Sequence, residues 1–327
     1  MSSKTPYRAA TLLQRAVLVA AIGAAACACS GSHDSAAAGS LDAGFGSGGK
    51  VTTDLGSSAD RANTVTIQTD GRIIVAGSTQ DPAQGDNFAV VRYITDGQLD
   101  PSFGDGGKVS TDFGSESDIA NAVVIQPDGK IVAVGTSHGT ASGDDIALAR
   151  YAVDGKLDAS FGNGGKVRTD LGSKADHANA AAIQSDGRII VAGSTQDPAR
   201  GDNFAVARYT TDGKLDPSFG DGGKVSTDFG GESDIANAVV IQPDGKIVVV
   251  GTSHGTDTGD DIALARYTTD GKPDISFGND GKVSTDLGSK ADHANAAAIQ
   301  SDGRIIVAGS TQDPTQGDNI AILRYHG

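Results

Sequence analysis

Short apolar runs, each about as long as a β-strand, alternate with turn residues along most of the chain. One run covers residues 120–126, and after Pro127-Asp128-Gly129 a second run covers residues 130–135. An Asp-Gly pair between two apolar runs is typical of a tight hairpin, because the turn needs positive φ, which aspartate tolerates and glycine adopts freely. Turn residues recur at intervals of roughly 8 to 12 residues and no window has a helical period, so the pattern predicts an all-β fold.

This pattern repeats every 58 residues from Leu41 onward, without insertion or deletion. Each repeat holds the hairpin, a third strand that ends in Ala-x-x-Arg-Tyr, a second Asp-Gly turn and a short fourth strand. A fixed period of this length indicates that one supersecondary unit is stacked or arranged in a circle. The repeats are 41–98, 99–156, 157–214, 215–272 and 273–327.

The apolar runs are nearly continuous rather than alternating, as in residues 247–250. Such runs indicate that both faces of a sheet are covered. Small sheets packed face to face around an axis satisfy this, so we expect a five-bladed β-propeller of four-stranded antiparallel blades. The first repeat opens with only a fourth strand (41–54) and the last ends after its third strand at Tyr325. We therefore expect the N-terminal strand to complete the last blade and close the ring.

These repeats resemble the delta-60 repeat, a bacterial β-propeller repeat family. The resemblance rests on the Ile-Gln-x-Asp-Gly-Arg/Lys-Ile hairpin, the Ala-x-x-Arg-Tyr strand and the segment Leu-Asp-x-x-Phe-Gly-x-Gly-Gly-Lys-Val, and it covers Leu41 to Tyr325. Two departures are Pro273, which replaces Leu, and Asp280, which replaces Gly. The resemblance implies an exported propeller and brings no catalytic residue or cofactor with it.

The first 40 residues lie outside the repeat and are typical of an export signal. Three basic residues precede the apolar run 16–26, which is shorter than the about 20 residues needed to span a bilayer as a helix. We interpret residues 1–26 as a signal peptide. Cys27 follows small residues as in the lipobox of bacterial lipoproteins, with Cys29 as the alternative acceptor and a plain secretory signal as the other interpretation. Residues 27–40 are small and polar, which predicts a flexible tether.

The mature chain is strongly acidic. Removal of residues 1–26, which carry Lys4, Arg8 and Arg15 and no acidic residue, lowers the net charge from −15 to −18. Such a charge repels nucleic acid and anionic lipid surfaces. We expect membrane attachment through acyl chains only, at the outer membrane or cell surface, and a periplasmic or secreted protein without the anchor. We further expect a monomer that binds an envelope protein or polysaccharide.

The repeats alternate between two types, which bears on function. The second and fourth repeats differ at six of 58 positions, and residues 171–198 and 287–314 are identical, which gives the order A-B-A-B-A. An enzyme site needs different groups converging on one reacting atom, whereas near-identical blades present the same groups around a ring. We therefore expect a non-catalytic binding or interaction scaffold at the cell envelope. The alternative is a Ca²⁺-dependent hydrolase or lyase that acts at the channel mouth.

The candidate metal ligands are five aspartates that each precede x-Ala-Asn at the start of the predicted innermost strand. Carboxylate oxygens are the ligands that Ca²⁺ prefers, so the aspartates could hold Ca²⁺ around one channel mouth. Capping of the turn by local hydrogen bonds explains the same residues without a metal. No other cofactor is expected. The five are Asp60, Asp118, Asp176, Asp234 and Asp292.

Four histidines occupy two repeat positions in the predicted loops. They are His138 and His254 at one position, and His177 and His293 at the other, where the first repeat has Arg61. They form neither a His-Cys nor a His-x-x-x-His pattern of the kind that holds zinc. The sequence therefore predicts exposed loop histidines.

Overall fold

The computed structural model describes residues 17–18, 38–82, 85–139, 143–198, 201–255, 259–313, 315 and 317–327. These residues form strands and turns and no helix, which confirms the all-β prediction. Accordingly, no helix in this part of the chain could cross a membrane. Most of the predicted signal peptide lies outside the described residues, as do Cys27, Cys29 and nearly all of the predicted tether.

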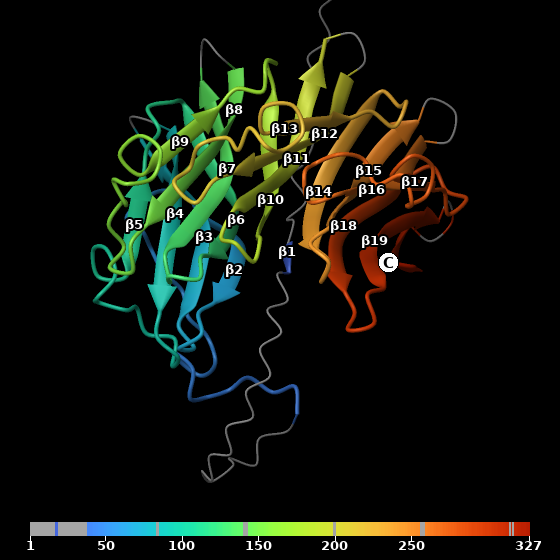
Figure 1. Cartoon of the computed structure of the whole chain (residues 1–327). Coiled ribbons are helices and arrows are strands. Elements are labelled where there is room, and N and C mark those ends of the chain that lie inside the picture. The colour runs from blue at the N-terminus through green and yellow to red at the C-terminus, as the bar shows by residue number, and fades with distance from the viewer. Residues whose placement is uncertain are drawn as a thin grey trace, which may run out of the picture.

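The strands follow the repeat and form structural units of neighbouring antiparallel strands (Figure 1). Units 1 to 4 have four strands each, and unit 5 has three. We call the contact between consecutive units a joint. Unit 1 holds β2 (Asp60–Ile67), β3 (Ile73–Asp81), β4 (Gly85–Tyr93) and β5 (Lys108–Thr111); unit 2 holds β6 (Ser117–Ile125), β7 (Ile131–Gly139), β8 (Gly143–Tyr151) and β9 (Lys166–Thr169); unit 3 holds β10 (Asp176–Ile183), β11 (Ile189–Asp197), β12 (Gly201–Tyr209) and β13 (Lys224–Thr227); unit 4 holds β14 (Ser233–Ile241), β15 (Ile247–Gly255), β16 (Gly259–Tyr267) and β17 (Lys282–Thr285); unit 5 holds β18 (Asp292–Ile299), β19 (Ile305–Asp313) and β20 (Gly317–Tyr325).

The hydrophobic core lies between units, which explains the continuous apolar runs. Residues 131–134 of β7 are all fully buried. Ile131 and Ala133 belong to the cluster shared with unit 1, and Val132 and Val134 to the cluster shared with unit 3. Successive side chains of a strand point to opposite faces, so a strand covered on both sides needs an apolar residue at each position. The face-to-face packing predicted from the sequence is therefore confirmed.

A β-bulge in the first strand of each unit strengthens the joints. In β6 the register shifts between Ala120 and Ala122, so Asn121 is the extra residue. Its Nδ2 donates a hydrogen bond of 2.9 Å to the carbonyl oxygen of Ala178 in unit 3. Gly135 lies opposite, where a Cβ atom would stand 1.9 Å from the carbonyl oxygen of Ile119, so only glycine fits there. Equivalent bonds run from Asn63 to Ala120, from Asn179 to Ala236 and from Asn237 to Ala294.

The predicted closure of the ring is not formed, because β20 is an open edge. The side chains of Ile320 and Ile322 are 86% and 62% exposed, whereas Phe88 and Val90 at the same positions of β4 are fully buried against unit 2, and β4 pairs with β5. The N-terminal segment lies on unit 1 instead, with Thr53 Oγ1 2.7 Å from the hydroxyl of Tyr93. Thr111 and Tyr151 make the same contact across the next joint. Unit 1 therefore holds this segment as it would hold the fourth strand of a preceding unit.

A further short strand lies between units 1 and 5. Strand β1 (Val17–Leu18) pairs in parallel with β2 at Thr64 and Val65, and it also contacts β18. Part of the predicted signal peptide thus lies between the two terminal units. Figure 1 shows β1 between β2 and β18.

Candidate functional site

The five predicted aspartates lie at the start of the first strand of each unit. All except Asp60 are fully buried. In unit 2, Asp118 Oδ2 accepts a 2.8 Å hydrogen bond from the N–H of Phe113, and Oδ1 accepts one from the hydroxyl of Ser115. Such bonds are typical of a turn cap. Among the described residues, no three of the five aspartates come within ligand distance of one another, so each belongs to its own joint.

Unit 4 departs from this arrangement. Gly231 replaces the serine that donates to the aspartate in the other units, while the N–H of Phe229 still donates to Asp234 Oδ2 at 2.7 Å. Burial raises the pKa of Asp234 above its usual range. By contrast, hydrogen bonds from Ser289 and other donors outweigh burial at Asp292 and lower its pKa. Gly231 in place of serine, Ser253 in place of Thr311 and Ile235 in place of His293 thus accompany opposite pKa shifts at two carboxyls in the same repeat position.

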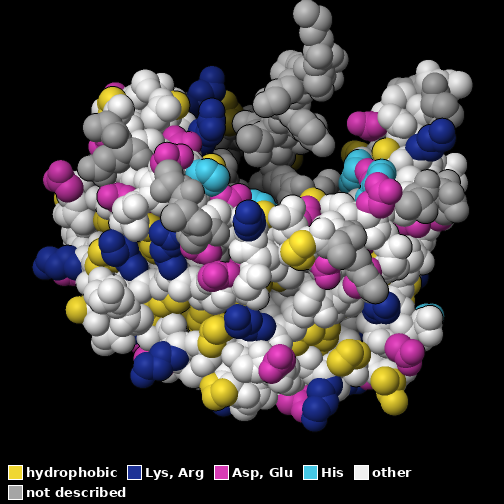
Figure 2. All heavy atoms as spheres, turned by 90° about the horizontal axis from the view of Figure 1, so that it is seen from above, with side chains coloured by type: hydrophobic (Ala, Val, Ile, Leu, Met, Phe, Trp, Pro, Cys, Tyr) yellow, Lys and Arg dark blue, Asp and Glu magenta, His cyan; other side chains and the backbone are white. Residues whose placement is uncertain are grey.

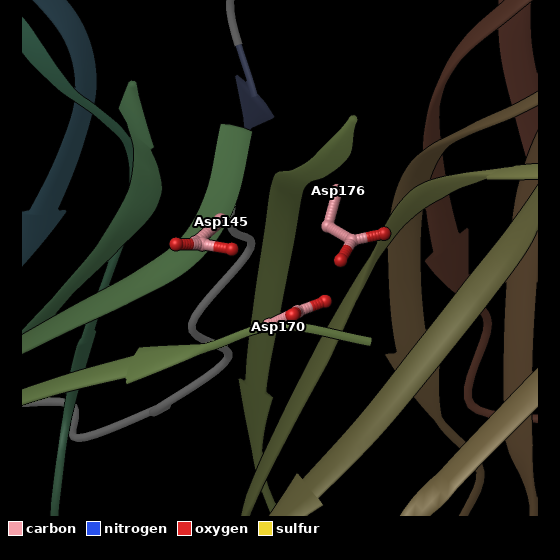
Figure 3. A group of neighbouring side chains, drawn as sticks. All are labelled: Asp145, Asp170 and Asp176. Carbon is pink, nitrogen blue, oxygen red and sulfur yellow. The ribbon is translucent and has the colours of Figure 1, made fainter. Parts of the chain in front are cut away.

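Two of the aspartates gain carboxylate neighbours that were not predicted. Asp176 lies with Asp145 of β8 and the exposed Asp170, and their oxygens lie within 4.8 Å of one another (Figure 3). Arg168 Nη2 donates to Asp145 at 2.6 Å in this group. Asp261, Asp286 and Asp292 form the same group between units 4 and 5, where Ser284 replaces the arginine. The sequence signal is an alternation of Asn and Asp at positions 87, 145, 203 and 261.

The histidines are also brought together, an arrangement that was not predicted from the sequence. His138 Nδ1 contacts Asp144 Oδ1, and His177 Nε2 of the next unit lies 3.5 Å from Asp144 Oδ2. The hydrogen bond to Asp144 raises the pKa of His138. His254, Asp260 and His293 repeat this arrangement between units 4 and 5. Figure 2 shows histidines beside acidic side chains at two places near the central hollow.

A serine motif in β7 is part of the sheet. Residues 135–139 match the Gly-x-Ser-x-Gly pattern of hydrolase nucleophiles. That pattern is functional on a sharp turn between a strand and a helix, whereas here it lies inside a continuous strand. The side chain of Ser137 is fully buried and donates to Ser115 at 3.0 Å. The motif therefore has a structural role.

The opposite end of the molecule, where the hairpin turns lie, has a cavity of about 790 Å³ lined by residues of units 1 to 3. Gln68, Gln126 and Gln184, which follow β2, β6 and β10, contribute the same amide from three units. Within the described residues, Oε1 of Gln68 and of Gln184 is buried and accepts no hydrogen bond. The glutamines with these unpartnered oxygens thus stand in the wall of the cavity beside the apolar side chains of Ile67 and Val153.

The ionisable groups of this cavity are held in one charge state. The N–H of Arg72 donates to Asp70, whose pKa falls as a result. The bond from Lys156 likewise lowers the pKa of Asp154. Arg92 forms an ion pair with Asp100 at 2.9 Å. A general acid or base works best with a pKa near the operating pH, so neither aspartate is suited to that role.

A family model matches the hairpin and the segment after it in every unit. The model is described as a domain of unknown function, DUF5122, β-propeller, and its matches cover more than half of the chain. The chain belongs to the DUF5122 β-propeller family. This confirms the predicted β-propeller repeat fold. The matched residues of this DUF5122 protein are 68–103, 126–161, 184–219, 242–277 and 300–326.

Other comparisons assign no activity to this DUF5122 protein. No curated protein matches it significantly. A solved protein of unknown function from Dyadobacter fermentans is 14% identical, with 79% of this chain and 77% of that chain covered and a TM-score of 0.46. A PL25 ulvan lyase is 13% identical (80% and 68% covered, TM-score 0.47). A gluconolactonase from Xanthomonas campestris is 15% identical (75% and 68% covered, TM-score 0.42).

Proposed function

We propose that this protein is an exported, non-catalytic β-propeller that binds a polysaccharide of the cell envelope in the cavity at its hairpin-turn end. The observation that carries the proposal is the repeated amide of Gln68, Gln126 and Gln184 along one cavity. Hydroxyls of a polysaccharide can donate to Oε1 of Gln68 and of Gln184, while Oε1 of Gln126 between them accepts from Arg150 at 3.3 Å and apolar side chains can cover the ring faces. Buried polar groups that lack a partner favour a ligand that supplies one.

The lack of a catalytic pair supports binding rather than turnover. The aspartates that line the cavity have lowered pKa values and local partners. The cavity lining contains no histidine, cysteine or glutamate among the described residues. Acid–base hydrolysis of a glycosidic bond needs two carboxyl groups of which one is protonated near neutral pH. This cavity therefore suits recognition.

A glycan-binding assay followed by a depolymerisation assay tests the proposal. The wild type should bind at least one envelope polysaccharide and release no shorter products from it. Gln68→Leu and Gln184→Leu should weaken binding, because each removes a free acceptor. Gln98→Leu is a matched control, since Gln98 is exposed and outside the cavity. Equal binding by all variants would refute the assignment of this cavity.

The proposal includes a lipid anchor on Cys27, with Cys29 as the alternative acceptor. Labelling of the producing cell with a fatty-acid probe should modify the wild type. Cys27→Ser should abolish the label if Cys27 is the acceptor, and Cys29→Ser should do so if it is Cys29. An unlabelled wild type would mean that the protein is periplasmic or secreted without an anchor.

The proposal also includes a five-bladed ring closed by residues 50–53 on β20. By the repeat, Ile320 corresponds to Phe88, which pairs with Thr111 of β5, so Thr53 is the expected partner of Ile320. The exposed apolar edge of β20 and the contact of Thr53 with Tyr93 both favour this closure. An unpaired apolar edge is a liability that folded proteins avoid.

A Ca²⁺-dependent hydrolase or lyase is the second candidate. The observation in its favour is the group of Asp261, Asp286 and Asp292, whose carboxylate oxygens lie close together. Oxygen ligands of this kind suit Ca²⁺. Under this alternative, Ca²⁺ should raise the melting temperature and start depolymerisation, and Asp292→Asn should remove both effects. If the bound polysaccharide stays intact in the presence of Ca²⁺, the result would exclude the enzyme and favour the binding protein.

A further inference from the structure

The turn that leads into β9 holds the only Asn-Gly pair of the chain, Asn163-Gly164. The N–H of Asn163 donates to the carbonyl oxygen of Lys166 at 2.8 Å, and the N–H of Lys166 donates back at 3.3 Å. Asn163 and Gly164 are both exposed. A Cβ atom at Gly164 would meet no other atom within 4 Å. The side-chain amide of Asn163 therefore lies beside an uncrowded backbone that is open to water.

The backbone nitrogen of Gly164 is available to react. Among the backbone hydrogen bonds of this described turn, none is donated by the N–H of Gly164. The bond that closes the turn, from Lys166 to Asn163, is longer than an ordinary N–H···O bond, so the turn opens readily. Glycine also reaches backbone conformations that are closed to other residues, because it has no Cβ atom. The nitrogen of Gly164 can thus approach the Cγ atom of Asn163.

We propose that Asn163 is a site of spontaneous deamidation, with water as the co-reactant. The nitrogen of Gly164 loses its proton to the solvent and attacks Cγ of Asn163. The new N–Cγ bond closes a five-membered succinimide, the bond from Cγ to Nδ2 breaks, and the nitrogen leaves as ammonia after taking up a proton. Water then adds to one of the two ring carbonyl carbons and opens the ring. The product at position 163 is aspartate or isoaspartate, depending on which carbonyl is attacked.

The fold already contains the aspartate product at the same position of other repeats. Asp105 and Asp221 stand there, and each makes the same two backbone bonds, with Lys108 and Lys224 respectively. The aspartate product should therefore leave the turn unchanged. Isoaspartate instead lengthens the backbone by one carbon inside a tight turn, so we expect it to break the pairing with Lys166, where β9 begins.

Asn279 is a matched control within the same molecule. It occupies the equivalent position of the fifth repeat, is exposed, and bonds to Lys282 in the same way. The residue after it is Asp280, the one non-glycine residue with positive φ among those that the structure describes. A side chain thus stands next to the nitrogen that would have to attack. We therefore expect Asn279 to keep its amide.

Mass spectrometry of the folded wild type, before and after incubation for weeks at mildly alkaline pH, tests the proposal. Conversion of amide to acid should be faster at Asn163 than at Asn279 by at least an order of magnitude, because only glycine leaves the attacking nitrogen unhindered. The rate at Asn163 should rise with pH, since the attacking nitrogen must lose a proton. Samples digested at time zero correct for conversion during the digestion.

Two reciprocal substitutions exchange the two turns. Gly164→Asp copies the turn of the fifth repeat and should preserve the amide of Asn163. Asp280→Gly copies the turn of the third repeat and should start conversion of Asn279. Both residue types already occur at this position, and the melting temperature checks that each variant is folded. Retention of the amide of Asn163 in the wild type, or equal rates at Asn163 and Asn279, would overturn the proposal.

Discussion

The guanidinium of Arg92 shows how the repeated charged residues serve the fold. Its Nε contacts Asp100 at 2.9 Å, and Nη1 and Nη2 donate to the carbonyl oxygen of Val153 and to Ser102. Its plane lies over the ring of Phe103, 4.5 Å from the ring centre. Because this arrangement recurs at Arg150, Arg208 and Arg266, the repeated arginine and phenylalanine are core residues.

Removing Asp100 from its buried ion pair with Arg92 should destabilise the protein strongly. Asp100→Ala leaves the Arg92 guanidinium buried without its counter-ion, and we expect a loss of about 3 to 5 kcal/mol in the free energy of unfolding. Urea unfolding measures the loss. Asp105→Ala, at an exposed position a few residues away, should change the free energy by less than about 0.5 kcal/mol. Equal effects of the two substitutions would contradict the structural role.

Asp158 and Asp274 should make stability depend on pH in the acid range. Burial acts to raise the pKa of Asp158, but bonds from Ser160 and Lys130 and the charge of Arg150 outweigh it and hold the pKa at about 2. The pKa of Asp274 is also about 2 for equivalent reasons. A carboxyl whose pKa is lower in the folded state contributes stability above its unfolded pKa, and this contribution is lost as the pH falls through the folded pKa.

The difference in stability between wild type and Asp158→Asn/Asp274→Asn should therefore shrink as the pH falls from about 4 to about 2. Urea midpoints at several pH values give this difference. Asp105→Asn, at an exposed position, serves as the control. A constant difference for the double variant would show that these carboxyls do not have the low pKa values described.

At the scale of an element, the bulged strand and the glycine opposite it act together. The bulge turns Asn121 toward the next unit. Gly135 has no Cβ atom, so the backbone of Ile119 can lie close to it. A bulge bends its strand and increases the local twist, which suits sheets that must splay around an axis. The Asp-x-Ala-Asn motif is thus both a turn cap and an inter-unit contact.

Asn121→Ala should weaken the joint between units 2 and 3. It leaves the carbonyl oxygen of Ala178 without this donor, which costs about 1 to 3 kcal/mol for a buried group. Chemical unfolding with intrinsic tyrosine fluorescence reports the loss. Asn163→Ala lies in an exposed turn and should be close to neutral. If both variants unfold alike, the amide of Asn121 does not hold the joint.

At the scale of the whole molecule, the two ends of the chain decide whether the ring closes. Unit 5 lacks a fourth strand, while residues 50–53 lie on unit 1 in the place where such a strand belongs. Strand β1 contacts both β2 and β18. Removal of the signal peptide would take away β1, so we expect closure in the mature chain.

Disulfide trapping tests closure in a chain that begins at residue 41 and so lacks Cys27 and Cys29. Ala89 pairs with Ser110, so by the repeat Ala321 should pair with Thr52, within reach of a disulfide. Thr52→Cys/Ala321→Cys should cross-link within one chain, as detected by mass spectrometry. Thr52→Cys/Ala263→Cys is the control, because Ala263 takes the equivalent place in unit 4. Cross-linked dimers would instead mean that strands are exchanged between copies.

Much of the fold could be predicted from the sequence, because the determinants of the strands are local. Asp-Gly turns and continuous apolar runs fixed the hairpins and the face-to-face packing. The His138–Asp144–His177 cluster could not be found this way, since two of its members lie in different units and meet only through the pairing of Asp144 with Ala175. The open edge of β20 was not predicted, because the phase of the repeat alone favours closure and residues 17–18 were assigned to the signal peptide and not to a strand.

The alternation of repeat types has a consequence for the geometry of the rim. Two repeat types cannot alternate all the way around a closed ring with an odd number of units. Two units of the same type must therefore be neighbours at one joint. In the closed ring that we propose, this joint would lie between units 5 and 1, where Arg61 stands at the histidine position and would face Asp318. The two joints that carry histidine pairs (His138 with His177, and His254 with His293) would then have one joint between them on one side and two on the other, so they could not lie diametrically opposite each other.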